Sequence, residues 1–95
     1  NYIPNENTSI EIENLNKEKQ DLSNFNLKKA QLENIYLVEA SMKNCNLSKA
    51  NLKNASMFGA DLAGANLFKT NLENSNLKMI FKEIPSKKRG KLLCL

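Results

Sequence analysis

The chain has 95 residues and a formal net charge of +4, from 14 lysine and arginine residues against 10 aspartate and glutamate residues. This length suits one small domain, which buries only a limited share of its surface. Histidine is absent, which excludes histidine-activated nucleophiles and histidine-bearing zinc sites. No apolar run is long enough to span a membrane.

The first twenty residues carry no visible secretion signal, because they are polar and acidic. We therefore expect a soluble protein of the cytoplasm or of an organelle interior. The chain starts with Asn1 instead of methionine, which indicates a processed or partial chain.

Residues 1–19 are expected to cover the N-terminal end of the fold that follows. The stretch SIEIENL, residues 9–15, alternates apolar and polar residues, and Ile12 lies ten residues before Leu22. This spacing keeps the register of the repeat described next, although Lys17 takes its following position. The pattern predicts a degenerate first turn or a covering strand.

Residues 20–79 repeat with a period of five, which is neither helical nor that of an ordinary strand. Two residues before each central position, nine of the twelve copies have alanine or a residue close to it in size. One unit buries too little to be stable alone, so the copies must stack into a shared core. The twelve central positions, all predicted to be core, follow one another without an insertion: Leu22, Leu27, Leu32, Leu37, Met42, Leu47, Leu52, Met57, Leu62, Leu67, Leu72 and Leu77.

The consensus A-(N/D/S)-L-x-x resembles that of the pentapeptide repeat family. The resemblance implies an all-β fold: a right-handed quadrilateral β-helix of about three coils, twenty residues each, with capping termini. In that fold the central residue and the small residue two before it point inward. Phe25 and Ile35 are large for the small position, so the first coil is either wider or tolerates this variation.

Columns of residues twenty apart predict the outer surface. Lys29, Lys49 and Lys69 stack one coil apart, with Lys28 beside them. Stacked like charges are unfavourable. The column is therefore a candidate anion-binding stripe, or else a set of lysines that extend into water, which is the favoured interpretation. Two asparagine columns are expected to pass amide hydrogen bonds between coils: Asn26, Asn46, Asn66 and Asn34, Asn54, Asn74.

An apolar feature lies on the same side of successive coils. Tyr36, Val38 and Phe58 occupy outward positions there, and Phe68 is outward on the opposite side. A contiguous exposed apolar patch indicates a contact surface. We predict that Tyr36, Val38 and Phe58 contact a protein partner.

The inventory of reactive groups predicts no catalytic, cofactor-binding or metal-binding residue, and hence no enzymatic activity, cofactor or small-molecule substrate. Cys45 takes a small-residue position and is expected to be buried and inert, and with Cys94 it cannot complete a structural zinc site. Asp21 and Asp61 fall two coils apart in one column, too far for a carboxylate pair.

Residues 80–95 abandon the period and are expected to form a C-terminal cap and a basic tail. Ile80, Phe81 and Ile84 are predicted to fold over the last coil. The tail carries five bases and one acid. A solvated tail is favoured over contact with nucleic acid or an anionic membrane. The terminal leucines leave self-association through an end cap open.

The expected function is a non-catalytic structural or protein–protein interaction module, a rigid docking block within a larger assembly. Some pentapeptide repeat proteins instead mimic DNA and protect topoisomerases from quinolone drugs or toxins. Three coils would be roughly 14 Å tall, and a DNA mimic of that height needs about eight negative charges. Residues 20–79 hold five acids and seven bases, a net charge of +2, which disfavours this alternative.

Overall fold

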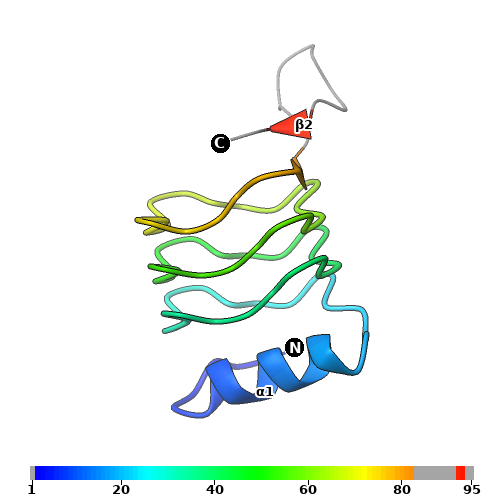
Figure 1. The fold of residues 1–95 in the computed structure, drawn as a ribbon. Coiled ribbons are helices and arrows are strands. Elements are labelled where there is room, and N and C mark those ends of the chain that lie inside the picture. The colour runs from blue at the N-terminus through cyan, green and yellow to red at the C-terminus, as the bar shows by residue number, and fades with distance from the viewer. Residues whose placement is uncertain (1, 83–91, 94–95) are drawn as a thin grey trace.

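The computed structural model of the protein describes residues 2–82 and 92–93. Helix α1 (Thr8–Lys17) lies across one end of a stack of chain layers, and the short strands β1 (Ile80–Phe81) and β2 (Leu92–Leu93) lie at the other end (Figure 1). We call residues 21–40, 41–60 and 61–80 layers 1, 2 and 3.

The layers are joined by parallel backbone pairing between residues twenty apart. Asn26 pairs with Asn46, which pairs in turn with Asn66. Hydrogen bonds run in both directions between layers: the Leu27 N–H donates to the carbonyl of Asn46 at 2.7 Å, and the Asn46 N–H donates to that of Phe25 at 3.0 Å. Parallel backbone pairing therefore joins a repeat to the repeat four copies later in the sequence.

A tight turn ends each repeat. The residue two after the central position has a positive φ, between 57° and 73°, in every repeat from Asn24 to Met79. The N–H of the following residue bonds back to the central carbonyl, as from Ala30 to Leu27 at 3.0 Å. Positive φ at the third residue is the geometry of a type II turn. Layer 1 makes four such turns, at residues 24, 29, 34 and 39.

The core is a column of the central residues with small side chains between them. All nine central residues from Leu22 to Leu62 are 0% exposed, and the small residues from Ala30 to Ala65 are also buried. Leu77 is buried, whereas Leu67 and Leu72 are only partly buried. These two lie in layer 3, where no further repeat stacks on them among the described residues.

The two large residues at small positions are accommodated differently. Ile35 is buried in the core at 1% exposure. Phe25 is partly buried, and its ring lies 5.3 Å from that of Tyr2. Layer 1 has no layer beneath it, so the N-terminal segment covers the phenyl ring instead.

The N-terminal segment is a helix, so the expected strand or degenerate turn is wrong and the all-β prediction is incomplete. Thr8 and Ile12 are buried and Leu15 is partly buried. Their spacing of i, i+4 and i+7 puts them on one helical face. Ile10, which a strand would have placed beside Ile12, is 65% exposed. The helix pairs its backbone groups within itself, and the buried Ile12 side chain covers the end of the core.

Side chains of α1 also replace the missing layer beneath layer 1. The Glu13 carboxylate accepts a hydrogen bond from the Tyr36 N–H at 2.8 Å. The Asn16 amide donates to the Val38 carbonyl at 3.3 Å. Unpaired edges invite association, and these bonds close part of this one.

At the other end, β1 pairs antiparallel with β2, with Ile80 opposite Leu93 and Phe81 opposite Leu92. Ile80 is buried, in agreement with a capping role. Lys82 donates from its ammonium to the Ala65 carbonyl at 2.6 Å. Several residues of the predicted cap and tail lie outside the described residues: Ile84, Lys87, Lys88, Arg89, Lys91, Cys94 and Leu95.

Candidate interaction surfaces

In eight of the twelve repeats, the residue before the central position stabilises the turn that follows it. Its side-chain oxygen accepts a hydrogen bond from the N–H two residues later, an Asx turn. Asn46 does so with Ser48 at 3.0 Å, and also accepts from the Ser48 hydroxyl at 2.7 Å. Seven further repeats share the backbone bond, those of Asp21, Asn26, Asn51, Asp61, Asn66, Asn71 and Asn76.

These bonds correct the prediction of asparagine ladders. The oxygens of Asn26, Asn46 and Asn66 are engaged within their own repeats. Among the described residues, one hydrogen bond joins side-chain amides of different layers: the Asn51 amide donates to the Gln31 side-chain oxygen at 3.3 Å. Asn34, Asn54 and Asn74 instead occupy the positive-φ turns. Intra-repeat bonding wins because the turn N–H has no backbone partner.

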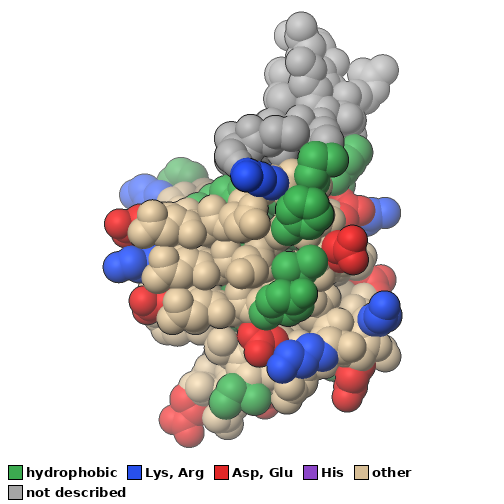
Figure 2. Space-filling model, in the orientation of Figure 1, with side chains coloured by type: hydrophobic (Ala, Val, Ile, Leu, Met, Phe, Trp, Pro, Cys, Tyr) green, Lys and Arg blue, Asp and Glu red, His purple; other side chains and the backbone are tan. Residues whose placement is uncertain are grey.

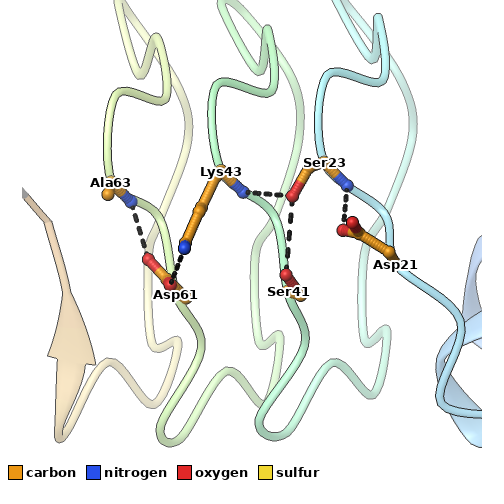
Figure 3. Close-up of polar contacts among 6 residues, drawn as sticks. All are labelled: Asp21, Ser23, Ser41, Lys43, Asp61 and Ala63. Atoms are coloured by element: carbon orange, nitrogen blue, oxygen red, sulfur yellow. Dashed lines mark hydrogen bonds and ion pairs between the residues drawn. The ribbon is translucent and has the colours of Figure 1, made fainter.

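One polar column does cross the layers (Figure 3). The Ser23 hydroxyl accepts from the Lys43 N–H at 3.2 Å and lies 3.4 Å from the Ser41 hydroxyl. The Lys43 ammonium lies 3.7 Å from the Asp61 carboxylate. Hydrogen bonds from Ser23, first from its side chain and then from its backbone, hold the pKa of Asp21 below its usual value. Asp21 and Asp61 are separated by these groups, so they form no carboxylate pair.

The side chains predicted to contact a partner are exposed or partly so. Tyr36 is 49% exposed and Phe58 is 40% exposed. Val38 and Phe58 occupy equivalent turn positions in adjacent layers, and the Glu39 N–H donates to the Phe58 carbonyl at 2.7 Å. Hydrophobic side chains form a column across the layers on the face shown in Figure 2.

The structure extends this surface beyond the residues singled out from the sequence. Met79 takes the turn position of Gly59 one layer higher, and Phe81 follows it in β1. Both are exposed. The twenty-residue columns of Tyr36 and of Val38 with Phe58 lead instead to Asn76 and Lys78 in layer 3, so counting columns in the sequence does not find Met79 and Phe81. We call Tyr36, Val38, Phe58, Met79 and Phe81 the apolar ridge.

A groove of about 760 Å³ adjoins the apolar ridge where α1 ends. Tyr36 and Val38 belong to both features. The groove contains charges of both signs, so it favours neither an anion nor a cation. Its other lining residues are Asn16, Lys17, Lys19, Gln20, Asp21, Glu39 and Ser41.

The candidate anion-binding residues stack at one turn. Lys29, Lys49 and Lys69 have φ values of 62°, 60° and 57°. The Lys29 N–H donates to the Ser48 carbonyl and the Lys49 N–H to that of Phe68. The Lys69 ammonium lies 5.4 Å from the Phe68 ring centroid. We call Lys28, Lys29, Lys49 and Lys69 the lysine corner.

Cys45 is buried, and its thiol donates to the Leu22 carbonyl at 2.9 Å. Burial raises the pKa of Cys45 to about 11. The thiolate is the reactive form, so Cys45 is protonated and unreactive near neutral pH. Thr70 makes the equivalent bond to the Leu47 carbonyl at 2.7 Å, which explains how a polar residue serves at a small position.

Within residues 2–82 and 92–93, no three His, Cys, Asp or Glu side chains gather closely enough to hold a metal ion. The same part of the chain has no helix with the length and apolar character needed to cross a membrane.

Two solved structures to which the chain is similar are those of cyanobacterial proteins. The chain is similar to alr5209, a pentapeptide repeat protein from Nostoc PCC 7120, with 23% identity over 92% of this chain and 85% of that one and a TM-score of 0.44. HetL, a pentapeptide repeat protein involved in heterocyst differentiation regulation from the cyanobacterium Nostoc sp. strain PCC 7120, is 22% identical. That match covers 78% of this chain but 43% of HetL, with a TM-score of 0.31.

No curated protein matches the chain by sequence. The family model for pentapeptide repeats matches residues 21–54 and 45–78, with eight copies. These ranges span more than half of the sequence, and the resemblance seen in its consensus is confirmed. The chain belongs to the pentapeptide repeat family.

Proposed function

We propose that the chain is a non-catalytic structural module that docks a protein partner within a larger assembly. Its scaffold is a right-handed quadrilateral β-helix of about three coils. Backbone pairing between residues twenty apart, with a turn every five residues, supports this geometry. The apolar ridge is the docking surface.

The observation that carries this proposal is the continuity of the apolar ridge. Among the described residues after α1, the large exposed hydrophobic side chains are Tyr36, Phe58, Met79 and Phe81 of the ridge, and Phe68. The ridge residues gather on one side instead of being scattered, and contiguous exposed apolar surface is typical of contact sites. Aromatic residues and methionine are also the types enriched at protein interfaces.

The scaffold suits docking because hydrogen bonds between the layers fix the backbone that carries the surface side chains. Val38, Phe58 and Met79 of the ridge project from turns, and the neighbouring backbone is bonded between layers at Glu39 and Gly59. Presenting preorganised side chains lowers the entropy cost of binding. Two groups capable of chemistry have structural roles instead: Cys45 is buried, and the Asp61 carboxylate accepts a hydrogen bond from the N–H of its own turn.

Site-specific crosslinking tests the proposal with a matched control. A photoreactive phenylalanine analogue replaces either Phe58, on the ridge, or Phe68, which is 61% exposed on another side. In the native cell we expect a discrete protein adduct from position 58 and none of the same mass from position 68. Identical adducts from both positions, or none from position 58, would contradict the proposal. An adduct with the mass of two copies would assign the ridge to self-association.

A further inference from the structure

The lysine corner is isolated from the acidic residues of its own layers. Residues 24–32, 44–52 and 64–72 stack on one another, as the pairing of Asn26, Asn46 and Asn66 shows. These three segments contain all four lysines of the corner and no acid. The ion pairs found among the described residues, Lys17 with Glu13 and Lys43 with Asp61, lie elsewhere.

Amide groups beside the lysines are oriented to donate. The oxygens of Asn46 and Asn66 accept from turn N–H groups. A backbone N–H bonds to the amide oxygen and not to the amide nitrogen, so both NH₂ groups point away from the turn. On the other side of the corner, the oxygens of Asn51 and Asn71 are engaged in the same way. The surface around the lysines is therefore rich in donors.

Lysine is a poor choice for these turns if folding is the only requirement. Asparagine tolerates positive φ better than lysine. It occupies the equivalent position in five other repeats, at residues 24, 34, 44, 54 and 74. Layers about 4.8 Å apart also bring three like charges close together. Local choices that disfavour folding are expected where a surface serves binding.

We propose that the lysine corner binds a linear chain of linked phosphate groups. Lysine ammoniums are phosphate ligands that act as point charges, and the flanking amides add neutral donors. Three stacked turns span about 10 Å, so a chain of phosphates running along the stack meets all three lysines, whereas one free phosphate does not. Inorganic polyphosphate and the backbone of a single-stranded nucleic acid both present this chemistry. The corner is two turns away from the apolar ridge, so this site is independent of the docking function.

The test uses the triple variant Lys29→Asn, Lys49→Asn, Lys69→Asn. Asparagine is the residue of five equivalent turns, so thermal unfolding should show the fold unchanged or stabilised. Binding is measured by fluorescence anisotropy over a series of salt concentrations. The probes are labelled polyphosphate and labelled oligothymidylate with equal numbers of phosphates. The matched control, Lys43→Gln, Lys53→Gln, Lys78→Gln, removes the same three charges from other columns.

We expect the corner variant to reduce the slope of log K against log salt by about 2, since each contact with a single strand contributes about 0.7. The control should keep the parental slope for the same probe. Binding of both probes would assign recognition to the phosphate chain alone, and binding of the oligonucleotide only would assign it to a nucleic-acid strand. Equal losses in the two triple variants, or parental binding by the corner variant, would overturn the proposal.

Discussion

The carboxylate of Glu13 accepts a hydrogen bond from the backbone N–H of Tyr36 at 2.8 Å. One layer higher, the equivalent N–H of Ser56 bonds to the carbonyl of Ile35 at 2.9 Å. A side chain of α1 thus takes the place of a backbone carbonyl that an earlier layer would have supplied. The same contact ties the helix to a residue of the apolar ridge.

Replacing Glu13 with alanine should therefore loosen the junction between α1 and layer 1. Hydrogen bonds to charged groups contribute about 1.5–3 kcal/mol when buried, and exposure of this site reduces the expected loss to about 1 kcal/mol. Urea denaturation measures the loss, and hydrogen exchange of the Tyr36 amide should accelerate. Glu13→Gln keeps an oxygen acceptor and should be milder. Lys17→Ala removes only the exposed ion pair to Glu13, so a loss equal to that of Glu13→Ala would contradict this explanation.

Core truncations should depend on the layer in which they fall. Leu52 is 0% exposed, and Leu72 is only partly buried. Leu52→Ala should cost about 2–5 kcal/mol of unfolding free energy, in the range of well-packed cores. Leu72→Ala should cost clearly less, because its site already lacks a layer on one side. Equal losses in urea denaturation would mean that layer 3 is as tightly packed as layer 2.

Substitutions at Gly64 distinguish the effect of backbone strain on stability from the effect of side-chain crowding. Its φ is +73°, and an added Cβ would overlap Oδ1 of Asn44, the end of a flexible side chain. Both Gly64→Ala and Gly64→Asn require Asn44 to move, but asparagine adopts positive φ more readily. We expect alanine to lower the unfolding free energy by about 1–2 kcal/mol and asparagine by less. The reverse order in thermal or urea unfolding would show that crowding dominates.

Cys45 should make stability fall at high pH. Its folded pKa is raised from 9.0 to about 11, chiefly by burial. Above pH 9 the unfolded thiol loses its proton while the folded thiol keeps it, so ionisation favours the unfolded state until pH 11. The loss should reach about 2–3 kcal/mol by pH 11. Urea denaturation between pH 8 and pH 11 measures it, and Cys45→Ala should remove this part of the pH dependence. A parental slope in the alanine variant would contradict the assignment.

The five-residue period by itself predicted the inward positions, whereas the resemblance of the consensus to a known family implied the stacking of residues twenty apart. This succeeded because each repeat contacts the chain at a constant offset, so a column read from the sequence is a column in space. The exceptions lie in layer 3, where the described residues include no further repeat twenty positions later. Leu67 and Leu72 carry the core pattern but lie in layer 3, and their partial burial follows from position, not from residue type.

The tertiary structure alone decided the ends and the roles of polar side chains. Residues 8–15 fit a period of two through Ile10 and Ile12, and a helical period through Thr8, Ile12 and Leu15, and only docking against layer 1 selects the helix. The asparagine columns likewise predicted hydrogen-bonded ladders between layers, but the oxygens of Asn46 and Asn66 accept hydrogen bonds from turn N–H groups of their own repeats. Lys82 belongs to the segment predicted as a cap and basic tail, yet its ammonium donates a hydrogen bond to the Ala65 carbonyl. In each case a backbone group without a partner determined the outcome, and such groups are set by the arrangement of the chain in space.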